Sequence, residues 1–258
     1  MTYLARISSA FPAFLYTLSL STGFAADQIA VQYANPSPPL VAQAAPPAPA
    51  APIYTPPRRG APTSEHRVGG GTRAGKNLPT VTVLVPDHTG LTISEQPTLF
   101  WFLTEPLDVP MEIVVTEIGA DSPLLEHRLP APAAAGIQRI RLADHNVRLM
   151  PGKEYEWSIA LVIDAAHRSR DLFATGTIER IEPSSTMSAQ IAHASRTEIP
   201  AHYAAAGLWY DALTSVSDLV DGSPANPEFR TQRAGLLDQV GLKDASQFDR
   251  TVQKRSAS

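Results

Sequence analysis

Residues 154–163 read EYEWSIALVI, and this stretch determines the expected fold. From Tyr155 and Trp157 onward, aromatic and aliphatic residues occupy every second position, and charged or small residues fill most positions between them. Successive side chains of a β-strand point to opposite faces, so a period of two places the large apolar groups on one face. The stretch therefore predicts a strand whose aromatic side chains lie in a core and whose carboxylates face away from it.

Six further segments around this strand have strand-like patterns. Residues 80–85 alternate threonine with valine, and residues 97–103 are apolar on both faces, as expected of a strand buried between two sheets. The other segments are residues 111–116, 124–129, 137–142 and 173–181. About seven short strands, separated by turns of Pro, Gly and Asp without a helical period, predict a β-sandwich over residues 78–182.

Residues 184–250 are predicted to be helical. Leucine and valine recur three and four residues apart between residues 208 and 220, which is the period of an amphipathic helix. Asn226 is a suitable N-cap for a further helix with Pro227 at its first position. Pro200 falls where an earlier helix is expected, so we predict a break in that helix.

Two local patterns resemble known modules. Residues 149–157, LMPGKEYEW, resemble the turn and penultimate strand of fibronectin type III domains, where the tyrosine hydroxyl bonds to the upstream backbone and its ring packs in the core. Residues 207–212 with Pro224 are similar to the second helix and closing turn of a tetratricopeptide repeat. Fewer than two such repeats fit, and each repeat buries its apolar face against a neighbour, so the helices should pack against the sandwich or against a partner.

The expected fold class is therefore α+β. It is an immunoglobulin or fibronectin III-like β-sandwich followed by a small α-helical, tetratricopeptide-like C-terminal region, and residues 251–258 are expected to form a disordered tail.

The N-terminus is typical of an export signal. Residues 1–25 hold one charged side chain, Arg6, and then an uncharged run that ends in small residues suited to a signal peptidase. We expect cleavage after Ala25 and a periplasmic or extracellular protein that is not integral to the membrane; a retained anchor is the alternative. The chain has no cysteine, which excludes disulfides, thiolate metal sites and cysteine nucleophiles.

A spacer and a basic segment follow. Residues 26–66 are rich in Pro and Ala and are expected to form a disordered linker, with a docking motif for a proline-reading domain as the alternative. Residues 67–77 form a basic, glycine-rich collar. The arginines that we expect to contact an anionic polysaccharide are Arg58, Arg59, Arg67 and Arg73.

Four spaced motifs resemble one protein family. They are PDHTGLT at residues 86–92, EQPTLFWF at 95–102, LMPGKEYEW at 149–157 and AGLWYDAL at 206–213. In this order they resemble the secreted bacterial proteins grouped as domain of unknown function 928, over about residues 67–242. No activity is established for that family, so the resemblance implies architecture and export and leaves the function open.

The charge and the motifs of the sequence disfavour several functional classes. A net charge of −4 disfavours a dedicated nucleic-acid binder. The sequence contains neither a His-Glu-x-x-His motif nor a Gly-x-Ser-x-Gly elbow. Carboxylate pairs for glycoside cleavage could be drawn from Glu112, Glu154 and Glu156, but spacing alone does not pair them. We expect no catalytic residues, no cofactor and no metal.

The expected binding surface is aromatic. Trp209 and Tyr210 are adjacent on a predicted helix, about 100° apart, so one of them, with Asp211, is expected to face a partner. The alternative is that Trp209 and Tyr203 wedge the helices against the sandwich. The leading hypothesis is an exported adaptor or assembly factor that binds another envelope or secreted protein. The alternative is a polysaccharide-binding module, and a hydrolase is less favoured.

Overall fold

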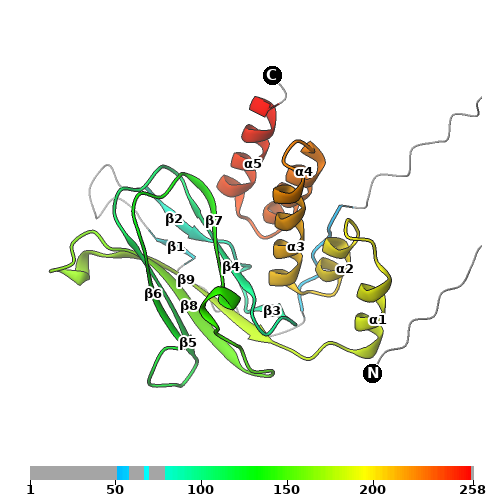
Figure 1. Cartoon of the computed structure of the whole chain (residues 1–258), viewed down its shortest axis with the longest axis horizontal. Helices are drawn as coiled ribbons and strands as arrows, with labels where there is room; N and C mark the ends of the chain where they lie inside the picture. The colour runs from blue at the N-terminus through cyan, green and yellow to red at the C-terminus, as the bar shows by residue number, and fades with distance from the viewer. Residues whose placement is uncertain (1–50, 58–66, 70–78, 257–258) are drawn as a thin grey trace, which may run out of the picture. The chain divides into compact units, whose positions relative to one another are not determined.

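A computed structural model of the chain describes residues 51–57, 67–69 and 79–256 (Figure 1). The predicted signal peptide, most of the predicted linker and most of the collar lie outside the described residues. The described part has the expected α+β class, with two sheets followed by helices. None of its helices is long and apolar enough to cross a membrane.

The strands of the described residues form two sheets. The first has the order β1 (Val68–Gly69), β2 (Val81–Val83), β4 (Thr98–Leu103) and β7 (Gly136–Arg141). The second has the order β3 (Gly90–Thr92), β9 (Leu172–Arg180), β8 (Glu154–Leu161), β5 (Met111–Glu117) and β6 (Leu125–Leu129). Neighbouring strands are antiparallel, except that β3 runs parallel to β9.

All seven predicted strands are confirmed, and β1 and β3 are additional. The two additional strands contain only two and three residues, which is too short for a period of two to be recognised. The strand predicted over residues 80–85 ends at Val83, after which the chain leaves the first sheet and joins the second as β3.

β4 has apolar residues on both faces because both of its faces are covered. The Phe102 ring lies 5.6 Å from the ring of Phe248 in the C-terminal helix, so this face of β4 meets the helices. Trp101 is on the alternate face and is also buried. The prediction of a strand buried on both faces is confirmed, but helices rather than a second sheet cover one of them.

Five α-helices occupy the described C-terminal part and lie to the right of the strand region in Figure 1. They are α1 (Ser185–His193), α2 (Ile199–Ala205), α3 (Trp209–Gly222), α4 (Pro227–Gln239) and α5 (Lys243–Ser256). Short 3₁₀ turns, η1 (Leu142–His145) and η2 (Arg168–Arg170), interrupt the strand region. Because α5 continues to Ser256, the predicted disordered tail over 251–258 is wrong for residues 251–256.

The predicted helix signals are confirmed. The Asn226 side chain accepts a hydrogen bond from the Glu228 N–H at 3.0 Å, and Pro227 is the first residue of α4. Pro200 lies in the first turn of α2, after the break that separates α2 from α1. Proline is tolerated there because the first helical N–H groups have no partner within the helix.

The corner before β8 forms as predicted. The Met150 N–H donates to the Tyr155 hydroxyl at 2.9 Å, and the Tyr155 ring is buried. Trp157 is also buried, so both aromatic residues are structural, as expected. This contact holds the turn that precedes β8 against the strand itself.

The first turn of α3 inserts two aromatic side chains into the sandwich. Trp209 Nε1 donates to the Leu84 carbonyl at 2.8 Å. The Tyr210 hydroxyl accepts a hydrogen bond from Trp157 Nε1 at 2.9 Å and donates to the Thr177 carbonyl at 3.0 Å. One continuous hydrophobic core therefore spans both the strands and the helices.

Gly90 gives Tyr210 the space that it occupies. A Cβ atom at Gly90 would lie 2.6 Å from the Tyr210 ring, closer than non-bonded carbon atoms can approach. The start of β3 therefore requires a residue without a side chain.

Residues 51–57, part of the expected linker, pack against the helices. The Tyr54 N–H donates to Gln239 Oε1 at 2.8 Å, and the Thr55 N–H donates to the Ala204 carbonyl at 3.0 Å. The buried Tyr54 ring contacts Trp209 edge-on, with centroids 5.1 Å apart, and its hydroxyl lies 2.9 Å from His88 Nε2. The Tyr54 ring and these backbone hydrogen bonds anchor a segment that was expected to belong to a disordered linker.

We expect Tyr210→Phe to destabilise the protein by about 1–3 kcal/mol, because the buried Trp157 N–H would lose its acceptor. Urea unfolding followed by tryptophan fluorescence measures this loss. Tyr203→Phe, at a partly buried position, is the matched control and should cost less. A loss below about 0.5 kcal/mol for Tyr210→Phe would contradict the central role of this hydrogen bond.

Candidate functional site

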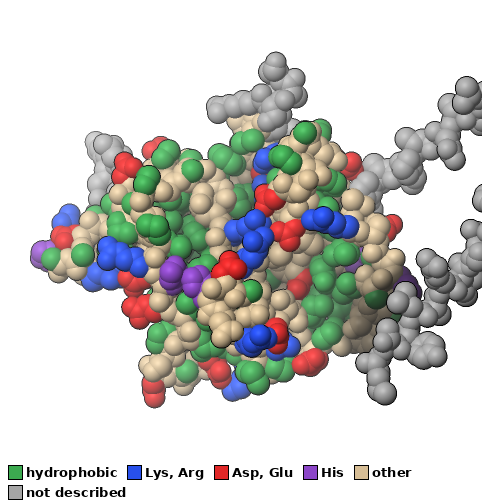
Figure 2. All heavy atoms as spheres, in the orientation of Figure 1, with side chains coloured by type: hydrophobic (Ala, Val, Ile, Leu, Met, Phe, Trp, Pro, Cys, Tyr) green, Lys and Arg blue, Asp and Glu red, His purple; other side chains and the backbone are tan. Residues whose placement is uncertain are grey.

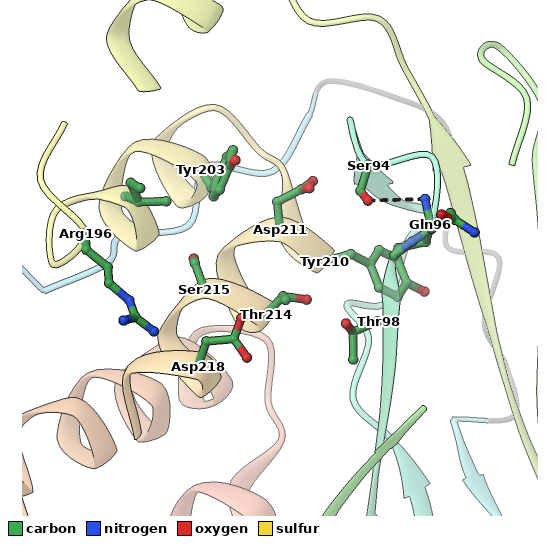
Figure 3. Close-up of a pocket in the computed structure, with 12 residues that line it drawn as sticks. Ser94, Gln96, Thr98, Arg196, Tyr203, Tyr210, Asp211, Thr214, Ser215 and Asp218 are labelled. Carbon is green, nitrogen blue, oxygen red and sulfur yellow. Dashed lines mark hydrogen bonds between the residues drawn. The ribbon is translucent and has the colours of Figure 1, made fainter. Parts of the chain in front are cut away.

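A cleft of about 360 Å³ lies where the connection between β3 and β4 faces helices α2 and α3 (Figure 3). Ten of its twelve lining residues have side chains that can form hydrogen bonds. The lining residues are Ser94, Gln96, Pro97, Thr98, Arg196, Ile199, Tyr203, Tyr210, Asp211, Thr214, Ser215 and Asp218. The cleft is the candidate functional site because it gathers polar groups from segments that are far apart in the sequence.

Helical spacing brings the α3 residues to one side. Asp211, Thr214, Ser215 and Asp218 are three or four residues apart, so they share the face of α3 that borders the cleft. Two of the four sequence motifs, at residues 95–102 and 206–213, contribute lining residues from opposite walls.

The opposite wall is held by local hydrogen bonds. Ser94 Oγ accepts from the Gln96 N–H at 3.2 Å, as the dashed line in Figure 3 shows. Gln96 Nε2 donates to the Val147 carbonyl at 3.2 Å. These contacts tie the lining of the cleft to the loop before the Tyr155 corner, so this wall is anchored by the sandwich.

Asp211 is the buried carboxylate of the cleft. It accepts a hydrogen bond from the Ile93 N–H at 3.0 Å. Burial raises the pKa of Asp211 from 3.8 to about 6, and hydrogen bonds from the Ile93 N–H and the Thr92 hydroxyl partly oppose this shift. The group therefore changes charge in a mildly acidic range, unlike an exposed aspartate.

Asp218 is paired with arginines of β7. Its Oδ1 atom lies 3.3 Å from Arg139 and 3.5 Å from Arg141, and Arg139 also lies 2.8 Å from Asp221. Figure 2 shows acidic and basic side chains meeting over the boundary between β7 and α3. This cluster balances the Asp218 charge and links the first sheet to α3.

One part of the lining is less polar. Pro97, Ile199 and the half-buried ring of Tyr203 line the cleft beside the hydrogen-bonding groups. Burial raises the pKa of Tyr203, and the nearby Asp211 carboxylate raises it further, so its hydroxyl stays protonated at neutral pH. The cleft therefore combines polar groups with a small apolar surface.

The predicted partner surface at Trp209, Tyr210 and Asp211 is wrong. These residues are 0%, 1% and 8% exposed, respectively. The prediction assumed that adjacent helical residues, about 100° apart, cannot both be buried. The first turn of α3 instead enters the sandwich, so consecutive residues are all enclosed. The alternative, in which Trp209 and Tyr203 wedge the helices against the sandwich, agrees with the structure for Trp209, whereas Tyr203 is only partly buried and lines the cleft.

Of the four arginines expected to contact a polymer, one lies within the described residues. Arg58, Arg59 and Arg73 lie outside the described residues. Arg67 donates to the Val85 carbonyl at 2.9 Å and to the Val240 carbonyl at 3.1 Å. Arg67 thereby joins the strands and the helices, and its contact with a polymer stays a prediction.

Sequence reasoning missed most of the cleft. The polar stripe Asp211, Thr214, Ser215 and Asp218 is visible in the sequence, but such a stripe ordinarily indicates the solvent-facing side of a helix. No sequence motif or periodicity around Arg196 or Ser94 indicates that either residue lines a site. Among the described residues, no group of three or more His, Asp or Glu side chains is placed to hold a metal ion.

Comparison with known proteins gives a family. The family model described as Domain of Unknown Function (DUF928) matches residues 68–249. The chain belongs to this family. The match includes both motifs that line the cleft, so the cleft lies within the DUF928 domain.

Other comparisons add little about this DUF928 protein. No curated protein matches it in sequence. The crystal structure of a multi-domain immunophilin from Arabidopsis thaliana aligns with 75% of this chain and 99% of that chain, with 7% identity and a TM-score of 0.19. A TM-score this low supports no conclusion about fold or function.

We expect Asp211→Asn to remove a pH-dependent loss of stability. Because the folded-state pKa is raised above 3.8, the folded protein binds this proton more tightly, so wild-type stability falls as the pH rises from about 4 to about 6. Relative to Asp211→Asn, the wild type should lose up to about 3 kcal/mol over this range and little beyond it. Urea unfolding at pH 4, 5, 6 and 7 measures the difference.

The control for this measurement is Asp121→Asn, at an exposed position. Its stability should follow the wild type across the same pH range. Parallel curves for wild type and Asp211→Asn would show that Asp211 titrates as an ordinary aspartate.

Proposed function

We propose that this DUF928 protein is an exported, non-catalytic binding protein of the cell envelope whose cleft binds a saccharide chain. The observation that carries the proposal is the lining of the cleft, in which hydroxyl, amide and charged groups surround a half-buried tyrosine ring. The signal-like sequence of residues 1–25 supports export.

The chemistry of a sugar fits such a lining. A sugar ring presents hydroxyls that both donate and accept hydrogen bonds, and it also has C–H faces that pack on apolar or aromatic surfaces. Thr98, Thr214 and Ser94 provide hydroxyls, which also both donate and accept. Tyr203 and Ile199 supply the surface against which a ring face can pack. The volume of about 360 Å³ is near the lower end of the usual range for ligand sites.

The carboxylates of the cleft support binding more than hydrolysis. Glycoside cleavage generally uses two carboxyl groups about 5–9.5 Å apart, one on each side of the bond. Asp211 and Asp218 are seven residues apart on α3, which separates them by about 10 Å along the helix axis. Asp218 is also paired with Arg139 and Arg141, which disfavours its acting as an acid or a nucleophile.

Protein-protein adaptor function stays a prediction. The surface expected for it, at Trp209 and Tyr210, is buried in the core. The cleft therefore supports the polysaccharide-binding alternative better, although at residues other than the arginines first expected.

We expect the wild-type protein to bind saccharides on a glycan array and Thr214→Trp to bind at least tenfold more weakly, because the indole would fill the cleft. The protein is purified from cells that express the full chain. Isothermal titration with the strongest array ligand gives the affinities, and thermal unfolding verifies that the variant is folded.

The matched control is Thr231→Trp, the same change at an exposed position of α4 away from the cleft lining. Its affinity should stay within threefold of wild type. Absence of saccharide binding by the wild type, or equal binding by Thr214→Trp, would contradict the proposed function.

A further inference from the structure

Arg196 lies in the connection between α1 and α2, and its side chain is a cation at the cleft. Its side chain extends towards α3, and its guanidinium points to the region of Asp218 in Figure 3. A Cβ atom added to Gly222, the last residue of α3, would lie 3.6 Å from Arg196 Nη2. The C-terminal end of a helix carries a partial negative charge, which favours a cation at this position. The exposed Arg196 side chain therefore lies beside the cleft, near the end of α3.

The donors of Arg196 are available. In the part of the chain that the structure describes, no hydrogen bond and no ion pair joins its guanidinium to another residue. A guanidinium carries five N–H donors in a planar fork that matches the two oxygens of a carboxylate. An arginine whose N–H donors have no partner among the described residues is suited to binding a ligand that supplies an anionic group.

The carboxylates of the cleft are already engaged. Asp218 is paired with Arg139 and Arg141 of β7. Asp211 is buried and accepts a hydrogen bond from the Ile93 N–H. Among the side chains that line the cleft, Arg196 is the cation, and no ion pair joins it to a carboxylate of the described residues.

We propose that the cleft selects acidic saccharides and that Arg196 binds the carboxylate of a uronic acid unit. This inference rests on the proposed function, because it names the class of saccharide that the same cleft binds. A carboxylate can accept two parallel hydrogen bonds from the guanidinium, an arrangement that is stronger and more directional than a bond to a neutral hydroxyl. The neutral groups of α3 and of the β3–β4 connection would then hold the sugar hydroxyls.

The test compares ligands that differ only in charge. Oligomers of galacturonic, glucuronic and mannuronic acid are titrated into the protein beside their fully methyl-esterified forms, which keep the ring hydroxyls and lose the negative charge. The protein is purified from cells that express the full chain, and affinities are measured by isothermal titration at low and at physiological salt.

The expected result is that at least one acid binds at least tenfold more tightly than its ester. Arg196→Gln should reduce this ratio to below threefold and leave the affinity for the ester within threefold of wild type. Added salt should weaken binding of the acid more than binding of the ester, because ions screen the contact. The control is Arg128→Gln, at an exposed arginine of β6, which should keep the wild-type ratio.

Three results would overturn the inference. Equal affinities of acid and ester would show that the cleft binds saccharides without regard to charge, which leaves the proposed function in place. An acid preference that survives in Arg196→Gln would show that another group recognises the charge. If no uronic acid oligomer binds, the inference fails, and the neutral saccharides of the glycan array decide separately whether the proposed function stands.

Discussion

The hydrogen bond from Trp157 Nε1 to the Tyr210 hydroxyl is the contact on which the rest of the structure depends. It joins the central strand of the second sheet to the first turn of α3 inside a core from which water is excluded. The Tyr210 hydroxyl also donates to the Thr177 carbonyl, so it satisfies a donor and an acceptor at once. Because unpaired polar groups are costly in such a core, this pairing sets where α3 begins relative to the strands.

The cleft follows from that placement. With Tyr210 buried in the core, the next residue, Asp211, accepts a hydrogen bond from the Ile93 N–H. The following turns of α3 then face the β3–β4 connection. Arg139 and Asp218 add an ionic link from β7 to the same helix. The Tyr54 segment packs on Trp209, so the aromatic pair at the start of α3 is enclosed from both the sandwich and the N-terminal side. Each of these contacts strengthens the joint between strands and helices.

Local patterns were sufficient to predict most of the separate elements. The period of two in β8 and the turn before it placed Tyr155 and Trp157 correctly in the core. The capping signal at Asn226 located the start of α4. β3 was missed because three residues hold no measurable period. The docking of Tyr54 was missed because one aromatic residue in a proline-rich stretch has no partner in its own neighbourhood.

The sequence by itself determined the α+β class, the seven main strands, the structural role of the Tyr155 corner and the resemblance to DUF928. These features depend on side-chain periodicity and on turn and cap chemistry within a few residues. Only the tertiary structure decided that Trp209, Tyr210 and Asp211 are internal and that a polar cleft with Arg196 at its edge lies beside them. The physical reason is that burial and charge pairing depend on which distant segments meet, and α3 meets the sandwich through its first turn.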